Sequence, residues 1–506
     1  MSSSNQILGT IIVTEESPST TELSFVISKD AEVKKGQYVE VAGYPGSTLG
    51  YVAEITRANR YFERPESVSE YEKAGKIGAH FPAELWEYTI AEVKILGNYH
   101  NGKFLRTFSP PKPGVPVINA DDDILRKFLG FTDSGLLLGS IQHHEVPVRL
   151  SLNRLIQKHL AVLAMSGAGK SHLSSVMLEE LLERRKEDGR VAIIVVDIHG
   201  EYTGFKHDQK YHSNTIVIDG KSIRIPLKKV SPEMIEEWLP NLSPAQKEIL
   251  RGAMLSLKKQ NSSTGYALKD LVNAICSSED TKSDSSKLAL KRTLSRLRSF
   301  KLLSEKGENP NLMFDVKPGK LLILDLSDID SLHKKQIIVS MIARRLFNLR
   351  KKNRIPPYLL LIEEAHNFAN QAESNEAISR RVIETIAREG RKFGASLCLV
   401  SQRPVNLSTT ALSQCNTHII LRVTNPNDLE HIQMSSEGID SRTAKSITSL
   451  KVGEAIIVGE AVNYPVFVSV RDRKSEKREK GAPLEQQALA FEENEKRKEE
   501  QVEAFL

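Results

Sequence analysis

From about residue 155, apolar runs of strand length alternate with segments of helical periodicity, and this alternation restricts the fold more than any other feature. A run that is apolar throughout indicates a strand buried on both faces, because a half-exposed strand would alternate apolar and polar residues. Such strands, when separated by helices, form a parallel sheet covered on both sides. We therefore predict an α/β core. The runs are HLAVLA (159–164), VAIIVVD (191–197), KLLILDLSD (320–328), YLLLIEEAH (358–366), ASLCLVSQ (395–402) and THIILRV (417–423).

The segments outside this core have different sequence patterns. Residues 1 to about 108 alternate short apolar runs with turn residues, which favours a small all-β barrel or sandwich. Between 231 and 313 the strands stop, and helix caps are found instead, at Ser231 and in a capping box of Ser243 with Gln246. The predicted organisation is an N-terminal β-barrel domain with its linker (1–150), the first part of the core (151–230), a helical insertion (231–313), the second part of the core (314–472) and a charged C-terminal tail (473–506).

Composition excludes several classes of protein. The three cysteines form no CxxC pair, which argues against a zinc site or a disulfide framework and favours a reducing compartment. No secretory signal is visible at the N-terminus, and no apolar run approaches the roughly 18 residues that span a bilayer. The formal net charge of +6 in 506 residues permits a polyanionic partner without requiring one.

The stretch AMSGAGKSHL (164–173) has the pattern of a phosphate-binding loop, since it follows a buried strand and precedes an amphipathic helix. Gly167 and Gly169 allow backbone N–H groups to turn towards an anion, Lys170 neutralises phosphate charge, and the Ser171 hydroxyl ligates Mg²⁺. Ala164 stands where the pattern has its leading glycine. Because alanine is the smallest replacement and the glycine binds no phosphate, this departure affects only the turn by which the chain leaves the strand.

A second apolar strand ends in two carboxylates, Glu363 and Glu364. A hydrolytic NTPase needs one acid to support Mg²⁺ and its waters, and we assign Glu363 to it. It also needs a general base for the attacking water, and we assign Glu364 to that role. In isolation two acids at a strand end are more often solvated, but a phosphate loop at another strand end favours the catalytic interpretation.

Three further segments carry polar groups near strand or helix ends. Gln402 ends a strand and is a candidate sensor of the γ-phosphate or of the attacking water, with an ordinary polar strand end as the alternative. Arg388 and Arg391 are candidates to enter a neighbouring subunit's site, although a basic helix end that matches the helix dipole explains them equally well. The segment VVDIHGEY (195–202) has no ligand spacing typical of zinc, so we expect a loop at the edge of the active site.

Together these motifs resemble the HerA family of archaeal and bacterial DNA translocases, which are relatives of the FtsK pumping ATPases. The resemblance covers nearly the whole chain. It implies a RecA-like P-loop core with an N-terminal HAS barrel, assembled as a homo-hexamer around double-stranded DNA. It also implies a NurA-type nuclease partner in DNA end resection for recombination repair. The motifs are MSGAGKS (165–171), DIHGEY (197–202), LIEEAHNF (361–368), REGRKFG (388–394) and SQRP (401–404).

The resemblance also implies roles for individual residues, with ATP and Mg²⁺ as cofactors. Arg388 is the first candidate for the arginine that acts in trans, and Arg391 the second. Glu363 and Glu364 match the family's Walker B acids, and Lys158 falls at a basic nucleotide contact. The residues expected to contact the nucleotide are Lys158, Gly167, Ala168, Gly169, Lys170, Ser171, His172, Val466 and Phe467.

Three functions are compatible with these residues. The first is a DNA-translocating ATPase, which would act in the cytoplasm in association with the nucleoid. The second is the same motor core acting on protein substrates. The third is a nuclease-recruiting ring on DNA ends in which ATP mainly controls assembly.

Overall fold

The computed structural model describes residues 6–503 except 16, 44–45, 60–86, 261–264, 278–283, 373–375, 437 and 478–483. Parts of the expected C-terminal tail, 478–483 and 504–506, lie outside the described residues. The chain forms two compact units. The first comprises Met1–Leu155, Leu163–Gly169 and Asn416–Arg471, and the second comprises Ile156–Val162, Lys170–Cys415 and Asp472–Leu506. Within the described residues, no helix has the length and apolarity to span a membrane.

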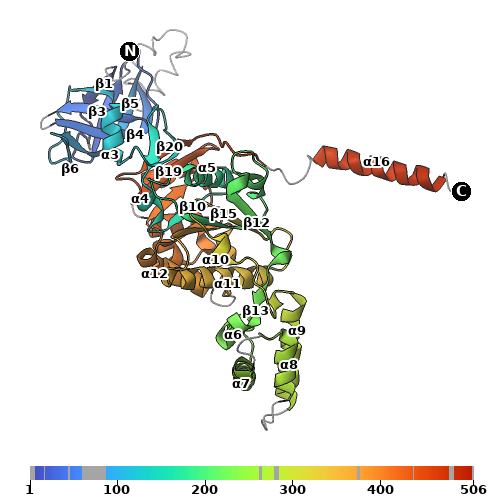
Figure 1. Cartoon of the computed structure of the whole chain (residues 1–506). Helices are drawn as coiled ribbons and strands as arrows, with labels where there is room; N and C mark the ends of the chain where they lie inside the picture. Colours follow the sequence, from blue (N-terminus) through green and yellow to red (C-terminus); the bar gives the residue numbers. More distant parts are fainter. Residues whose placement is uncertain are drawn as a thin grey trace, which may run out of the picture. The chain divides into compact units, whose positions relative to one another are not determined.

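The first unit begins with an antiparallel β-barrel (Figure 1). Its strands follow the order β2-β1-β7-β3-β4-β5-β6, and an additional pairing of β2 with β5 closes the sheet. Buried aliphatic side chains and Phe25 fill its interior. This confirms the small barrel predicted from the short, regularly spaced apolar runs. The strands are β1 (Ile7–Ile12), β2 (Glu22–Ile27), β3 (Tyr38–Gly43), β4 (Gly46–Asn59), β5 (Glu87–His100), β6 (Lys103–Leu105) and β7 (Pro116–Asn119).

The remainder of the first unit is built around antiparallel strands in the order β18-β19-β20-β8-β9. β18 pairs antiparallel with β19, with Thr417 opposite Gly459. The elements are α3 (Asp122–Leu129), β8 (Leu136–Ile141), β9 (Pro147–Leu150), β18 (Thr417–Ile420), α14 (Pro426–Ser435), α15 (Ser441–Thr448), β19 (Glu454–Gly459) and β20 (Val466–Val470), and α4 (Leu152–Ile156) follows β9.

The second unit contains the predicted parallel sheet, in the order β12-β15-β11-β16-β17-β10. Every residue of β11, β16 and β17 is buried, as expected for strands covered by helices on both faces. The sequence analysis did not predict β12, which lies at the edge of this set and is only partly buried. The strands are β10 (Leu160–Leu163), β11 (Ala192–Asp197), β12 (Thr215–Asp219), β15 (Leu321–Asp325), β16 (Tyr358–Ile362) and β17 (Ala395–Ser401).

Helices follow these strands in the chain. The α-helices of this part are α5 (Lys170–Glu183), α10 (Leu312–Asp315), α11 (Leu332–Lys351), α12 (Arg380–Glu389) and α13 (Thr409–Ser413). The short 3₁₀ helices of the second unit are η3 (Thr203–Lys206), η4 (His212–Asn214), η5 (Gly220–Ser222), η6 (Leu227–Lys229), η7 (Ala365–Asn367), η8 (Gly390–Phe393) and η9 (Pro404–Asn406). The last helix, α16 (Leu484–Glu503), belongs to the charged tail.

The helical insertion interrupts the parallel sheet between β12 and β15. The helices α7, α8 and α9 pack against one another in it (Figure 1). Its predicted caps are present: Ser231 caps α6, and the Ser243 and Gln246 side chains each accept a hydrogen bond from the other's backbone N–H. The elements are β13 (Ile225–Pro226), α6 (Pro232–Trp238), α7 (Pro244–Gln260), α8 (Leu268–Cys276), α9 (Asp284–Ser299) and β14 (Leu303–Ser304).

Candidate functional site

The phosphate loop has backbone conformations that its glycines make possible. Gly167 and Gly169 have φ of 77° and 104°, in the region that only glycine adopts freely. Ala164 is fully buried and keeps a negative φ, so the alanine needs no special conformation there. The N–H of Ala168 donates to the Met165 carbonyl, and α5 begins immediately afterwards at Lys170. The loop therefore presents backbone N–H groups and a helix N-terminus, which together favour an anion.

The lysine of this loop forms an ion pair with the second carboxylate of the other strand end. Lys170 Nζ lies 3.5 Å from Oε1 of Glu364, and the two side chains are only 11% and 7% exposed. Glu364 has a φ of 45°, a left-handed conformation that strains a residue with a side chain by about 1–3 kcal/mol. Because such strain needs support from the surroundings, the turn after β16 is a site candidate in its own right.

Glu363 lies in a different environment from its neighbour. Its Oε2 accepts a hydrogen bond of 3.1 Å from the N–H of Ile198, and its side chain is buried. Burial raises the pKa of Glu363 well above its usual range, and the nearby carboxylates of Asp197 and Glu201 raise it further. The two adjacent acids therefore have different environments: Glu363 lies near other carboxylates, whereas Glu364 forms an ion pair with Lys170.

Asp197, at the end of β11, organises the loop that follows it. Its Oδ1 accepts hydrogen bonds from the N–H groups of Gly200 and Glu201, and its Oδ2 accepts one from Tyr202. This explains why the sequence DIHGEY has an acid at its start. Within the described residues, no group of three or more acids, histidines or cysteines has a metal-binding arrangement. The same loop contacts Glu363 through the N–H of Ile198.

Sequence reasoning did not single out His366 and Ser401. His366 Nδ1 lies 3.3 Å from Oε2 of Glu364 and 3.2 Å from the Ser401 hydroxyl. A histidine two residues after the carboxylate pair was the available signal. Lys170 thus lies beside Oε1 of this carboxylate and His366 beside Oε2, although Oε2 accepts no hydrogen bond from the described residues.

The two candidate arginines are exposed and lie on either side of Gly390, at the junction of α12 and η8. Neither Arg388 nor Arg391 forms an ion pair or a side-chain hydrogen bond with another described residue. A Cβ at Gly390 would lie 2.2 Å from the carbonyl oxygen of Ala395, so this close approach requires glycine. The glycine thus fixes the turn from which both guanidinium groups extend.

The remaining predicted residues are distributed between the two units. In the second unit, Lys158, Ser171, His172 and Gln402 are half-buried. Ser171 and His172 lie in the first turn of α5, and Gln402 follows β17 directly.

Val466 and Phe467 lie in the first unit, where both are buried in β20. The ring of Phe467 lies 5.7 Å from the ring of Tyr51 on the barrel strand β4, measured between centroids. The predicted contact of Val466 and Phe467 with a nucleotide stays a prediction.

Comparison with known proteins agrees with the motifs. The family model of the HerA helicase central domain matches residues 136–346. A probable helicase of Methanocaldococcus jannaschii is 31% identical over 473 residues, which cover 89% of this chain and 88% of the relative. The DNA double-strand break repair helicase HerA of Pyrococcus furiosus is 30% identical over 523 residues, covering 90% of this chain and 91% of the relative.

Solved structures share the fold. VirB4 of Thermoanaerobacter pseudethanolicus superposes with a TM-score of 0.54 at 17% identity, over 68% of this chain and 99% of that one. The plasmid coupling protein TrwB, in complex with a non-hydrolysable ATP analogue, has a TM-score of 0.50 at 12% identity, over 71% of this chain and 94% of that one. These likenesses confirm the P-loop α/β fold. The identity shared with the two relatives along almost the whole chain shows the family, and the chain belongs to the HerA helicases.

Proposed function

We propose that this chain is an ATP-driven motor that moves double-stranded DNA and acts in the repair of DNA ends. The observation that carries the proposal is the pairing of Lys170 with Glu364, which joins the phosphate loop to a carboxylate at the end of another strand. The relatives' names, DNA double-strand break repair helicase, support DNA as the substrate.

The phosphate loop is the proposed binding site for ATP. Residues 167–172 would hold its phosphates, and Lys158 would add a basic contact, while Val466 and Phe467 are kept as further nucleotide contacts. A side chain at Gly167 would meet no described atom within 4 Å, so space is open beside the loop. Oε2 of Glu364 is buried and has no hydrogen-bond partner in the described part of the chain. Both features suit a polar ligand.

Ser171 and Glu363 are the proposed ligands of Mg²⁺. The hydroxyl and the carboxylate are oxygen donors of the kind that Mg²⁺ prefers, and one or two protein ligands are enough because this ion keeps several waters. When bound, the ion would neutralise phosphate charge. The three hydrogen bonds that Asp197 accepts keep the surroundings of Glu363 in place.

Glu364 is the proposed general base. Phosphates bound by Lys170 would compete for its ammonium group, which would leave the carboxylate able to accept a proton from water. His366 would hold the carboxylate in position from its other oxygen, and Gln402, which follows Ser401, would orient the water. General-base catalysis of this kind contributes about 10²–10⁴-fold in rate.

We also propose that the chain works as a homo-hexamer, with Arg388, or else Arg391, completing a neighbouring subunit's site. Their exposure, and the absence of ion pairs or side-chain hydrogen bonds to them from the described residues, support this role. The duplex would pass through the ring, held by contacts to its backbone that tolerate any sequence, because a motor must release at each step. A NurA-type nuclease is the proposed partner, and the cytoplasm at the nucleoid is the proposed location.

The test is ATP turnover measured with and without blunt duplex DNA, in the presence and absence of a NurA-type nuclease. We expect duplex DNA to raise turnover. Turnover that an unfolded protein stimulates and duplex DNA does not would favour a motor for protein substrates. If Lys170→Ala left the nuclease's activity on DNA ends unchanged, the ring would act as a scaffold.

A further inference from the structure

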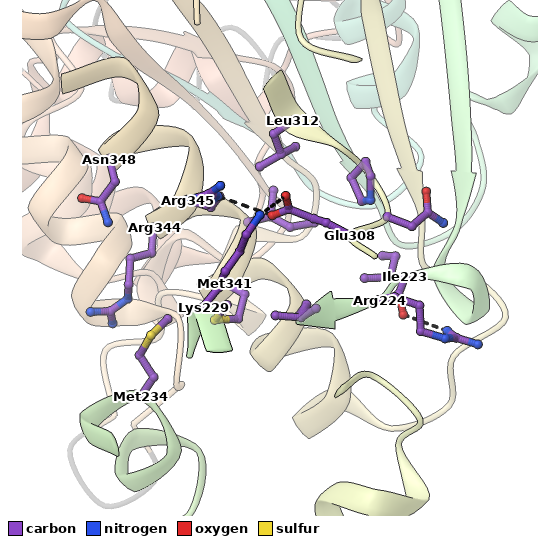
Figure 2. Close-up of a pocket in the computed structure, with 14 residues that line it drawn as sticks. Ile223, Arg224, Lys229, Met234, Glu308, Leu312, Met341, Arg344, Arg345 and Asn348 are labelled. Atoms are coloured by element: carbon purple, nitrogen blue, oxygen red, sulfur yellow. Dashed lines mark hydrogen bonds and ion pairs between the residues drawn. The ribbon is translucent and has the colours of Figure 1, made fainter. Parts of the chain in front are cut away.

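A pocket of about 110 Å³ lies in the second unit, away from the phosphate loop residues, where the helical insertion meets α11 (Figure 2). Residues from three segments line it: the stretch from β13 to α6, the stretch before α10, and α11 itself. Nothing in the mechanism proposed above uses this pocket. Its volume is well below the roughly 300–1,000 Å³ of sites for whole small molecules, so it would admit only a small group.

The pocket is lined by four cationic side chains, those of Arg224, Lys229, Arg344 and Arg345, and by one acid, Glu308. Glu308 is shared, since its carboxylate lies 2.5 Å from Lys229 Nζ and 3.4 Å from Arg345 Nε (Figure 2). Arg344 pairs with a second acid, Glu237, and the Arg224 guanidinium turns away from Glu308 and donates to the backbone carbonyls of Lys221 and Ile223 (Figure 2). With Glu237 included, four positive charges stand against two negative charges, so the lining has an excess of positive charge.

Two donors of these arginines lack acceptors. Arg344 pairs with Glu237 through Nη2 at 2.6 Å, but its Nε is buried without a hydrogen-bond partner among the described residues. The same holds for Nε of Arg345, for which Glu308 is within ion-pair distance but forms no hydrogen bond. A buried donor without an acceptor lowers the stability of the folded protein, so a bound ligand that supplies acceptor oxygens would stabilise the pocket.

The positive charge continues beyond the pocket. Arg224 belongs to a basic patch that we define as Lys221, Arg224, Lys301 and Lys334, in which Lys221 Nζ also lies 3.6 Å from the Asp328 carboxylate. Partial burial lowers the pKa of Lys334, and repulsion from the other three members lowers it further, against the opposing effect of Asp219. Like charges held together in this way are unfavourable in the free protein, and a polyanion relieves such repulsion.

We propose that this pocket and the adjoining basic patch bind backbone phosphates of the DNA that the motor moves. The proposal rests on the proposed function, because it assumes DNA as the substrate. Arginine guanidinium groups match phosphate geometry, and the pocket accommodates a phosphate but no nucleoside. Glu308 then acts as an internal competitor, since its carboxylate occupies two of the cations that a phosphate would use.

Opposite changes in the pocket should have opposite effects on DNA affinity. Arg345→Gln and Arg224→Gln each remove one phosphate contact, so we expect about tenfold weaker duplex binding. The slope of the logarithm of affinity against the logarithm of salt concentration should become shallower by about one. Glu308→Gln removes the competitor and should tighten duplex binding severalfold. A purely structural ion pair predicts no such gain.

The pair of the half-buried Glu236 with the exposed Arg251, in the same helical insertion, provides matched controls. Glu236→Gln and Arg251→Gln make the same changes of charge outside the pocket and should leave affinity near that of the wild type. Affinity would be measured by fluorescence anisotropy of a labelled duplex at several salt concentrations, with thermal unfolding of each variant to check its fold. A second arm would measure thermal stabilisation by inorganic phosphate without DNA.

The outcomes separate this inference from the proposed function. Wild-type protein that binds no duplex DNA overturns both. If the wild type binds duplex DNA and the pocket variants bind it with the same affinity as their controls, only the pocket proposal is overturned. If the variants change stabilisation by inorganic phosphate but not duplex affinity, the pocket takes a free oxyanion and the assignment to DNA is wrong. Weaker duplex binding by Arg345→Gln together with tighter duplex binding by Glu308→Gln supports the proposal.

Discussion

Lys170 Nζ lies 3.5 Å from Oε1 of Glu364, although 194 positions in the sequence separate the two residues. This contact brings the end of one strand of the sheet to the start of the helix that follows another. It also places a positive and a negative charge in a largely buried position, where each stabilises the other. Several measurable properties of the chain depend on it.

Glu364→Gln should retain nucleotide binding and lose hydrolysis by about 10²–10⁴-fold, because the amide cannot accept a proton from water. Steady-state ATP turnover and equilibrium binding of a labelled nucleotide would test this. Glu389→Gln, an exposed acid of the same unit, is the control and should behave as wild type. Normal turnover in Glu364→Gln would rule out this residue as the base.

Lys170→Met should destabilise the nucleotide-free protein, because it leaves the Glu364 carboxylate largely buried without its cation. Removing one partner of a buried pair costs about 3–5 kcal/mol. The double variant Lys170→Met/Glu364→Gln should recover part of that loss, since no charge is then left unpaired. Denaturant unfolding of the four proteins gives the coupling energy, and additive effects would mean that the ion pair is absent in solution.

Arg388→Ala should reduce turnover by about 10³–10⁵-fold if its guanidinium group completes a neighbour's site. Mixing Arg388→Ala subunits with Glu364→Gln subunits then restores some ATP turnover. In the mixed assembly, a Glu364→Gln subunit supplies Arg388 to the intact Glu364 of a neighbouring Arg388→Ala subunit. The same pairs made with Arg391→Ala show which arginine acts in trans. An Arg388→Ala protein with wild-type turnover would transfer the assignment to Arg391.

Gly390→Ala should destabilise the protein by several kcal/mol or shift the turn that carries both arginines, because the new Cβ would meet the Ala395 carbonyl oxygen at 2.2 Å. Gly252→Ala is the matched control. No atom lies within 4 Å of a Cβ there, in the exposed part of α7, so we expect stabilisation by about 0.5–1 kcal/mol. Thermal unfolding would distinguish the two, and equal stabilities would contradict the close approach at Gly390.

His159 should make stability depend on pH. Its Nδ1 accepts a hydrogen bond from the N–H of Leu397, and burial lowers its pKa from 6.5 to about 4. Between these values the unfolded chain binds a proton that the folded chain excludes, so stability falls as pH drops from about 6.5 to 4, by up to about 3 kcal/mol. Below about pH 4 this contribution is fully lost.

His159→Asn provides the comparison, since asparagine keeps an acceptor and tolerates the φ of 64° but does not titrate. The variant should be less stable than wild type at pH 7.5, and the difference should shrink as the pH approaches 4. Urea unfolding at a series of pH values measures this. A difference that stays constant with pH would show that His159 does not control the acid response.

Local patterns in the sequence determined the backbone of the phosphate loop and the type of most elements. The positive φ of Gly167 and Gly169 and the start of α5 at Lys170 depend on residues a few positions apart. Runs such as YLLLI are apolar throughout because both faces of the strand are covered. The capping box of Ser243 and Gln246 was predictable for the same reason, since its two hydrogen bonds join residues three positions apart.

Only the tertiary structure decided which of these residues meet. The sequence predicted different roles for the two adjacent acids but not their neighbours. Packing places Glu363 beside the loop that Asp197 holds and Glu364 beside Lys170 and His366. The pairing of β18 with β19 and the cationic pocket around Glu308 likewise depend on segments far apart in the chain. Spacing along the chain encodes contacts within a turn or a strand, whereas contacts across a sheet arise when many buried side chains pack together.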